Sequence, residues 1–467
     1  MPAELMAQYD RVVVEPDAIG VPPSGGAAEL FAYVSVGEVS QSRSWWQRVP
    51  RHLYLGVNRG WGSEIVDVGN PEWGAFFIAE VIAPLYARGY RAFFFDTLDS
   101  YRLVSRSESE LARHERGLVR IVLAVKKRWP SVKIVLNRGF EILPRVADAI
   151  AGIAAESLFQ SWDPTNQTYV PVPETGRQWL LSRLEDARKR FAVPVTVIDY
   201  VSAAEPERRR EVAKRILDLG FEPWVAGPAL DDIGVGAFEI VPRKVLFLYR
   251  SEPNGYLGTN DACALLAPII EHFGYVPEYL DVRGALPTRN LAGQYAGIVA
   301  MTGAVDGAVD YQRWLLSQID HGLRIVFLGD FGFAPSDAFL DALGLERGPD
   351  YSAPPVVVST RPSFGDFEAP LRPRSRMSIQ TSLRARSTNV RSVVRLENAK
   401  HETWDGAVIA KWGGYAFDPY LLESGLEGVR RWEIDPFRFL QRALDLPAIP
   451  APDVTTESGN RILTIHV

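Results

Sequence analysis

The chain has 467 residues, a mass of 52.0 kDa and a hydrophobic content of 47%, so it should bury two or three cores. A net charge of -6 excludes the broad basic surface that nucleic-acid binding requires. The single cysteine, Cys263, excludes an internal disulfide, and the six histidines are scattered without metal-ligand spacing. We therefore expect no metal, no cofactor and no nucleic-acid partner.

The amino terminus has neither the basic segment nor the apolar segment of a signal peptide. No run of about 18 apolar residues occurs in the sequence, so we expect no insertion into a membrane. These observations leave open a secreted protein whose signal peptide is absent from this sequence.

Eight strand-like runs in the first half of the chain alternate with helix-like segments. The runs are residues 11–14, 31–36, 53–57, 92–95, 133–136, 152–155, 195–200 and 222–226, and the helix-like segments are 72–88, 108–128, 175–191 and 205–219. Eight is the strand number of the closed parallel barrel. We predict a (β/α)8 TIM-like barrel over residues 8–240, imperfect between its first two strands, where the gap is too short for a regular helix.

Two of the apolar runs end in a carboxylate, AFFFD at Asp96 and GIAAE at Glu156. The carboxyl ends of barrel strands meet at one rim, so both acids should face one cleft. Glycoside hydrolysis needs such a pair, one acid to protonate the leaving oxygen and one to attack or stabilise the anomeric carbon. Either acid alone could be a helix N-cap or a turn residue. Their occurrence together favours a glycosidase with Asp96 and Glu156 as catalytic residues.

Further polar and aromatic residues near the same rim are candidates for binding substrate. Glu38 follows a strand and a glycine, and could bind a sugar hydroxyl or an amino group, or form a rim salt bridge. Trp162 lies near a predicted rim loop, where it could stack on a sugar face or pack in the core. The substrate-binding candidates are Tyr33, Glu38, Asp99, Tyr101, Asn137, Trp162 and Tyr200.

Four segments carry a resemblance to a known family: AYVSVGE at 32–38, FDTLDSY at 95–101, LNRGFE at 136–141 and AES at 155–157. In this order they resemble the endo-α-1,4-polygalactosaminidase superfamily, and within it the hydrolase region of the hydrolase/deacetylases of the bacterial Pel biofilm polysaccharide. The resemblance covers nearly all of the first half. It implies an exopolysaccharide substrate of partly N-acetylated α-1,4-galactosamine, a periplasmic or secreted location, and other proteins of the exopolysaccharide export complex as partners.

The strand count places Asp96 on the fourth strand and Glu156 on the sixth, which resembles retaining barrels of the α-galactosidase type. By that likeness Asp96 is the nucleophile, and Glu156, partly desolvated by the apolar run before it, is the acid/base. The reverse assignment stays open. The predicted function is a retaining endo-glycosidase. The alternative is a non-catalytic polysaccharide-binding or scaffold module of an exopolysaccharide modification and export complex.

The second half begins with short strands that alternate with helices, at 245–249, 261–273, 276–280, 298–302, 311–320 and 324–328. This alternation predicts a doubly wound α/β domain of the flavodoxin or glutamine-amidotransferase type over residues 244–347. No cysteine follows a central strand and no phosphate-binding glycine motif is present, so we expect this domain to be catalytically empty.

The remaining sequence contains β-prone runs separated by proline-rich and serine-rich stretches. Residues 348–450 are predicted to form a β-rich flank or extension of the second domain, with a helix at 436–444. Residues 451–467 are predicted to be a linker and the first strand of a further domain, because segment 461–467 looks like a buried strand. By the resemblance, a metal-dependent deacetylase domain would follow. An authentic terminal strand of the second domain is the alternative.

Overall fold

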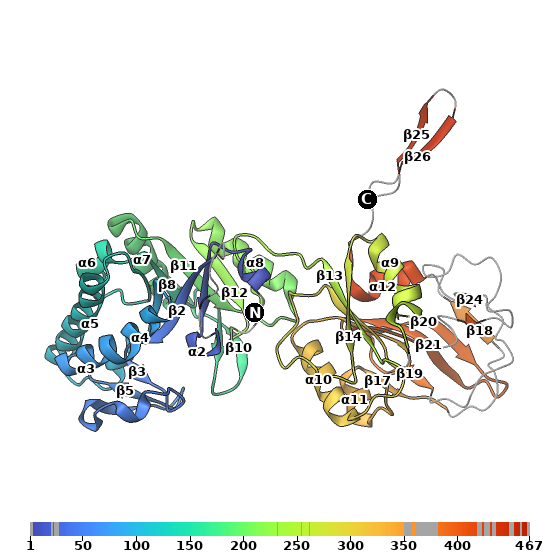
Figure 1. Cartoon of the computed structure of the whole chain (residues 1–467), viewed down its shortest axis with the longest axis horizontal. Helices are drawn as coiled ribbons and strands as arrows, with labels where there is room; N and C mark the ends of the chain where they lie inside the picture. The colour runs from blue at the N-terminus through green and yellow to red at the C-terminus, as the bar shows by residue number, and fades with distance from the viewer. Residues whose placement is uncertain are drawn as a thin grey trace. The chain divides into compact units, whose positions relative to one another are not determined.

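The computed structural model describes residues 3–19, 22, 28–230, 232–253, 255–260, 262–349, 357–360, 382–417, 423–424, 430–431, 436–447, 453–457 and 460–464. The chain forms two compact units, residues 1–230 with 234–240 and residues 231–233 with 241–467 (Figure 1). Among the described helices, none has both the length and the apolar character needed to cross a membrane. The domain boundaries drawn from the sequence stay predictions.

The first unit is built on a parallel sheet of seven strands in the order β1-β2-β6-β7-β8-β11-β12. The strands are β1 (Arg11–Val14), β2 (Glu29–Ser35), β6 (Ala92–Asp96), β7 (Lys133–Asn137), β8 (Gly152–Glu156), β11 (Val195–Tyr200) and β12 (Glu222–Ala226). The sheet curls until its outer strands approach each other. The Nη2 atom of Arg11 on β1 lies 3.3 Å from Oε2 of Glu222 on β12. The first unit is therefore an α/β fold with a curled, TIM-like parallel sheet.

The prediction of eight barrel strands is wrong by one. The predicted third strand corresponds to β4 (Tyr54–Asn58), which belongs to a separate antiparallel sheet with β3 (Glu38–Val39) and β5 (Ser63–Val66). In β4, exposed residues alternate with half-buried ones, whereas strands such as β6 are almost continuously buried, as parallel strands covered on both faces are. In chain order, Asp96 therefore ends the third strand of the parallel sheet and Glu156 the fifth.

The predicted helices of the first unit are confirmed. They are α3 (Pro71–Phe76), η3 (Phe77–Ile82) and α4 (Ala83–Ala87), which follow one another directly, and α5 (Glu108–Arg128), α7 (Glu174–Phe191) and α8 (Pro206–Asp218). Helix α5 begins where Ser107 Oγ accepts a hydrogen bond from the backbone N–H of Glu110 over 3.3 Å. Gly89 and Gly220, with φ of 108° and 79°, end α4 and α8 in a conformation that favours glycine.

Two small β elements extend from the carboxyl edge of the parallel sheet. The sheet β3-β5-β4 begins at Glu38, directly after β2, and the hairpin of β9 (Gln160–Asp163) and β10 (Thr168–Pro171) begins directly after β8. The remaining short elements are α1 (Ala3–Met6), α2 (Pro16–Ile19), η1 (Trp46–Arg48), η2 (Arg51–Leu53), η4 (Ser100–Leu103), α6 (Leu143–Val146) and η5 (Ala147–Ala149). Both β elements therefore lie on the side of the sheet where the predicted acids stand.

The second unit contains a mixed sheet of ten strands. Its parallel part has the order β14 (Val276–Asp281), β13 (Lys244–Tyr249), β15 (Gly297–Met301), β16 (Ile325–Gly329) and β22 (Gly413–Phe417), and its antiparallel part contains β17 (Leu345–Arg347), β18 (Val357–Thr360), β19 (Leu383–Ala385), β20 (Val390–Glu397) and β21 (Thr403–Ala410). Strand β22 pairs with both β16 and β21, so the β-rich segment extends the same sheet.

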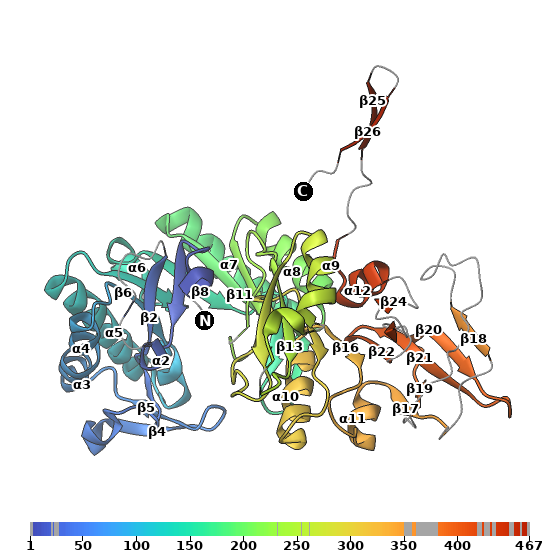
Figure 2. The same cartoon turned by 45° about the vertical axis from the view of Figure 1, so that its right-hand side comes forward.

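Helices lie on both sides of this sheet (Figure 2). They are η6 (Leu257–Thr259), η7 (Ala262–Leu266), α9 (Ala267–His272), α10 (Ala308–Asp320), α11 (Asp337–Ala342) and α12 (Pro436–Leu444). On one side α9 contacts α12, with the rings of His272 and Phe437 5.2 Å apart, and α10 and α11 lie on the other side. The flavodoxin or glutamine-amidotransferase type of this unit stays a prediction.

Two further strand pairs complete the described elements. They are β23 (Glu423–Ser424) with β24 (Arg430–Arg431), and β25 (Asp453–Glu457) with β26 (Asn460–Thr464). The predicted terminal strand overlaps β26, which pairs antiparallel with β25, and residues 465–467 lie outside the described residues.

Candidate active site

Five polar side chains stand on five neighbouring strands of the parallel sheet. In sheet order they are Tyr33 on β2, Asp96 on β6, Asn137 on β7, Glu156 on β8 and Tyr200 on β11. The last four are each the final residue of their strand, and Asp96 is in register with the final residue of β2. Because all five strands are parallel, these side chains gather at one edge of the sheet.

Asn137 links the two predicted catalytic acids. Its Nδ2 atom donates to Asp96 Oδ1 over 2.8 Å and to Glu156 Oε1 over 3.0 Å. These two carboxylate oxygens therefore lie no farther apart than the sum of the two distances, about 5.8 Å. The structure thus brings Asp96, Asn137 and Glu156 together in one polar cluster.

The outer oxygen of each acid is held by a tyrosine. Tyr33 donates its phenol to Asp96 Oδ2 over 2.7 Å, and Tyr200 donates to Glu156 Oε2. Burial, and then the nearby Asp96, raise the pKa of Tyr33, while burial and Glu156 raise the pKa of Tyr200. Both phenols therefore stay protonated at neutral pH and act as neutral donors to the acids.

Asn137 keeps one polar atom unused. The residue is 8% exposed, and its Oδ1 atom is buried and has no hydrogen-bond partner among the residues that the structure describes. A buried acceptor without a partner costs free energy, about 1–3 kcal/mol, unless a ligand supplies a donor. This buried oxygen does not contact the two acids, and binding of a sugar hydroxyl or amino group by Asn137 stays a prediction.

Arg138 was not identified from the sequence, although it stands inside the LNRGFE segment. Its guanidinium donates to the backbone oxygen of Glu156 and, over 3.1 Å, to Asp99 Oδ2. The Arg138 and Asp99 side chains are 36% and 42% exposed. Arg138, which follows β7, therefore links the segment after β6 to the end of β8, and substrate binding by Asp99 stays a prediction.

Glu38 is placed differently from the expectation. The residue is 4% exposed, and its carboxylate accepts hydrogen bonds from Asn58 Nδ2 over 2.8 Å, from Ser100 Oγ over 2.6 Å and from Ser63 Oγ. Its hydrogen-bond partners among the described residues are neutral, and the carboxylate is buried, so neither the expected substrate contact nor the alternative rim salt bridge is seen. Glu38 instead connects the sheet β3-β5-β4 to η4, the turn that follows Asp96.

Tyr101 and Trp162 each contact another aromatic ring. Tyr101 is 2% exposed and stacks on His114, with ring centroids 5.4 Å apart, so it packs in the core. Trp162 is half-buried on β9 and makes an edge-to-face contact with Tyr169 at 4.9 Å. Trp162 therefore lies on the hairpin that follows Glu156, where sugar stacking stays a prediction.

Asp199 is a second residue that the sequence analysis missed. It is fully buried, one position before Tyr200, and accepts backbone hydrogen bonds from Leu158, Phe159 and Gln160 over 2.6, 2.7 and 2.8 Å. Burial raises its pKa to about 6, and the three N–H donors oppose that rise. An aspartate within the apolar run VTVIDY was the available signal.

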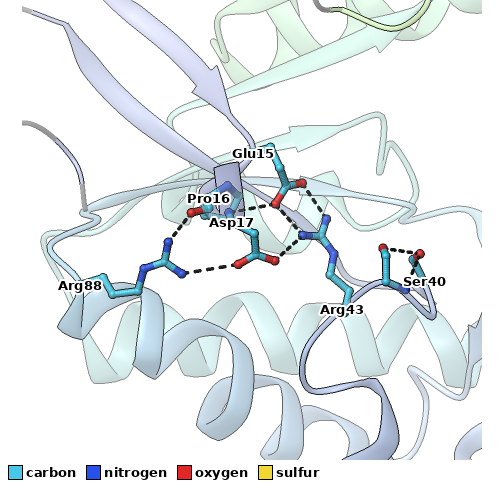
Figure 3. A network of polar contacts seen from close by, with 7 residues as sticks. Glu15, Pro16, Asp17, Ser40, Arg43 and Arg88 are labelled. Carbon is cyan, nitrogen blue, oxygen red and sulfur yellow. Dashed lines mark hydrogen bonds and ion pairs between the residues drawn. The ribbon is translucent and has the colours of Figure 1, made fainter. Parts of the chain in front are cut away.

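A network of charged side chains follows the end of β1 (Figure 3). Arg43 donates two hydrogen bonds to the Glu15 carboxylate, of 2.6 and 2.8 Å, and one to Asp17 of 3.1 Å. Arg88 forms an ion pair with Asp17, with its Nη1 atom 3.6 Å from Oδ1. Such a two-pronged arginine–carboxylate contact fixes the geometry of the arginine. The charge of Arg43 also opposes the rise in the pKa of Tyr33. The network therefore adds a fixed positive group on the Tyr33 side of the acid pair.

Among the described residues, no group of three or more His, Cys, Asp or Glu side chains is arranged to hold a metal ion. The side-chain donors to the two carboxylates are two phenols and an amide. These donors are uncharged, so the site presents two adjacent carboxylates held by neutral groups.

Comparison with known proteins identifies a family. Residues 24–241 match the model of glycoside hydrolase family GH114. The glycoside hydrolase domain of PelA from Pseudomonas aeruginosa is 30% identical, with 51% of this chain and 95% of that chain covered and a TM-score of 0.47; a variant of that domain matches equally. Aspergillus fumigatus Ega3 in complex with galactosamine matches at 12% identity, with 47% of this chain and 84% of that chain covered and a TM-score of 0.35. No curated protein matches the chain.

The curled parallel sheet with paired carboxylates at its carboxyl edge is that of a glycoside hydrolase. The chain belongs to glycoside hydrolase family GH114.

Proposed function

We propose that the first unit is a retaining endo-glycosidase that cleaves an α-1,4-linked, partly N-acetylated galactosamine polymer. The observation that carries this proposal is the bridge from Asn137 to Asp96 and Glu156, which limits the separation of the bridged oxygens to about 5.8 Å. The two hydrogens of an amide nitrogen point about 120° apart, which corresponds to an oxygen separation of about 5 Å. Retaining glycosidases hold their acids about 5–5.5 Å apart and inverting ones about 6.5–9.5 Å apart.

The proposed reaction has two steps. In the first, an Asp96 oxygen attacks the anomeric carbon while Glu156 gives its proton to the leaving oxygen, so the glycosidic bond breaks and a glycosyl ester forms. In the second, Glu156 takes a proton from water, whose oxygen attacks the same carbon and releases Asp96. Two inversions give net retention.

The roles of the two acids follow from their spacing in the sheet. Glu156 ends the second strand after that of Asp96, the same interval that separates acid/base and nucleophile in the retaining barrels to which we likened this sequence. The sequence predicts the two acids on the fourth and sixth strands, whereas they end the third and fifth. The interval of two strands between them is unchanged. The interval therefore supports Asp96 as nucleophile and Glu156 as acid/base.

In this proposal, the neutral donors around the acids either position the carboxylates or bind substrate. Tyr33, Asn137 and Tyr200 hold the carboxylates in place, since each of their hydrogen bonds ends on an acid oxygen. Oδ1 of Asn137 has no partner, which suits a donor group of the sugar. Tyr33 and Tyr200 thus become positioning residues in this proposal, and Asn137 both positions the acids and binds substrate.

The substrate class rests on the sequence segments that resemble the polygalactosaminidase superfamily, supported by the likeness to the PelA hydrolase domain. We extend the proposal to an exopolysaccharide of the Pel type, to a periplasmic or secreted location and to partners in an exopolysaccharide export complex.

The deciding experiment is a reducing-end assay on galactosamine oligomers of defined length, with and without acetyl groups. We expect new reducing ends at internal bonds, and products whose first-formed anomer is α when followed by proton NMR. Glu156→Gln is the control and should form no product while still binding polymer. β-anomers would contradict retention, and binding without new reducing ends in the wild type would favour the scaffold alternative.

A further inference from the structure

Asp199 is tied to the acid pair through the backbone. Its carboxylate receives the N–H groups of Leu158, Phe159 and Gln160, three consecutive residues that begin two positions after Glu156. All three distances are between 2.6 and 2.8 Å, as expected for hydrogen bonds to a charged acceptor. One buried side chain thus fixes the segment that leads from Glu156 into the hairpin of β9 and β10.

Side chains on both faces of strand β11 therefore contact Glu156 or the segment that follows it. Neighbouring residues of a strand point to opposite faces, so Tyr200 and Asp199 act on different sides. Tyr200 donates to the carboxylate of Glu156, and Asp199 holds the backbone that follows it. Arg215 on α8 lies over the ring of Phe159 at 3.9 Å, which covers the held segment on the helix side.

We infer that Asp199 is a positioning residue for the acid/base Glu156, acting through residues 158–160. The inference rests on the proposed function, in which Glu156 must reach the leaving oxygen. Without Asp199, the buried N–H group of Leu158 and the partly buried ones of Phe159 and Gln160 would lose their acceptor, and the segment after Glu156 would settle in other positions. Proton delivery depends steeply on this geometry, whereas attack by Asp96 does not involve the held segment.

The test compares two substrates with the same sugar chain. One is a galactosamine oligomer, whose leaving oxygen needs a proton, and the other carries a 2,4-dinitrophenyl leaving group, which departs without one. For Asp199→Asn we expect kcat on the oligomer to fall about 10- to 100-fold with KM nearly unchanged. The pre-steady-state burst of dinitrophenolate, which reports only the formation of the glycosyl ester, should change by less than about 3-fold, because that step does not need the acid. Steady-state turnover of this substrate is not compared, because hydrolysis of the ester still needs Glu156 as base.

A matched control comes from the second unit. Asp405 is also buried, at 4% exposure, and accepts from the backbone of Ala385 over 2.8 Å and from Ser392 Oγ over 2.6 Å. Asp405→Asn should leave both kinetic constants unchanged. Hydrogen exchange of the peptide 157–163, followed by mass spectrometry, should accelerate in Asp199→Asn and stay unchanged in Asp405→Asn.

Equal losses on the two substrates would show that Asp199 only supports the fold, and full activity despite faster exchange would show that the held segment does not position Glu156. Either result overturns the inference. If Asp199→Asn does not fold, Asp199→Glu is measured with the same two substrates, and the same selective loss is expected. A wild type that cleaves neither substrate would contradict the proposed function. The exchange measurement would still test whether Asp199 fixes residues 158–160.

Discussion

Tyr33 and Asp96 stand on adjacent strands, and the phenol of Tyr33 donates to Asp96 Oδ2 over 2.7 Å. Tyr33 thereby uses its only hydrogen on the acid and has none left for a sugar. The sequence predicts that Tyr33 binds substrate, whereas in the proposed mechanism its contact positions Asp96, the nucleophile of that proposal.

Removing this phenol should slow the chemical step. We expect Tyr33→Phe to lower kcat about 10- to 100-fold, because a hydrogen bond to a charged group contributes about 1.5–3 kcal/mol. KM should change little. Steady-state kinetics on the oligomer check this, with Tyr90→Phe as control, since the buried Tyr90 hydroxyl has no hydrogen-bond partner in the described part of the chain. A raised KM at constant kcat would indicate instead that Tyr33 binds substrate.

Asn137 offers a sharper test because its amide separates two carboxylates. In Asn137→Asp the donor between Asp96 and Glu156 is replaced by a third negative group at about the same position. We expect activity at neutral pH to fall at least about 10³-fold, with part of it returning in acid, where one of the three groups is protonated. Asn137→Ala should lose activity without that recovery. A flat pH profile for Asn137→Asp would contradict the bridge.

Chemical rescue assigns the two acids. In Asp96→Ala, azide should take the place of the nucleophile and give a glycosyl azide of inverted configuration. In Glu156→Ala, azide should instead attack the glycosyl ester on Asp96 and give the retained azide. The products are identified by NMR. The opposite pattern of configurations would exchange the two roles.

Much of the first unit follows from the sequence, because long buried runs and helix caps are local signals. Asp96 and Glu156 could be paired from their runs alone, since parallel strands bring their carboxyl ends together. Strand β4 was misplaced because five residues of moderate hydrophobicity do not reveal which sheet they join. The alternation of exposed and half-buried residues in β4 depends on the elements packed against it, so it can be seen only in the folded chain.

The directions of polar side chains could not be predicted in the same way. Glu38 and Asp96 both follow apolar runs, yet Glu38 turns inward to Asn58, Ser63 and Ser100. These partners lie 20 to 62 positions away, and only the folded chain joins them. Asp199 was missed for the same reason, because its partners are backbone groups on another strand's loop.

The charge of the site predicts how binding responds to salt. Asp96, Glu156 and Asp99 supply three carboxylates at this edge of the sheet. Of the arginines described near them, Arg138 contacts Asp99, and Arg43 is already paired with Glu15 and Asp17, so the local charge is negative. A partly deacetylated, cationic polymer should bind more weakly as salt rises from about 0.1 M to 1 M, where the screening length falls from about 10 Å to 3 Å. The fully acetylated polymer is the control. Equal salt dependence of both, measured by calorimetry with Glu156→Gln, would contradict an electrostatic preference.

His114 predicts the acid sensitivity of the fold. The residue is 2% exposed, stacks on Tyr101, and lies 3.5 Å from Asp67. Burial, and then Arg113, lower its pKa below the ordinary value, so the unfolded chain binds the proton more readily than the folded one. The free energy of unfolding should therefore fall as pH decreases below about 6.5, by at most about 1.4 kcal/mol per pH unit from this residue, and the fall should end below the lowered pKa.

Replacing this histidine should remove that part of the acid sensitivity. We expect the urea midpoint of His114→Gln to change less between pH 7 and pH 5 than that of the wild type, even where the variant is less stable at pH 7. His52→Gln serves as control, because the His52 side chain is 61% exposed. The turn that Tyr101 belongs to follows Asp96, so protonation of His114 should also loosen η4. Identical pH slopes for wild type and His114→Gln would show that other groups cause the acid sensitivity.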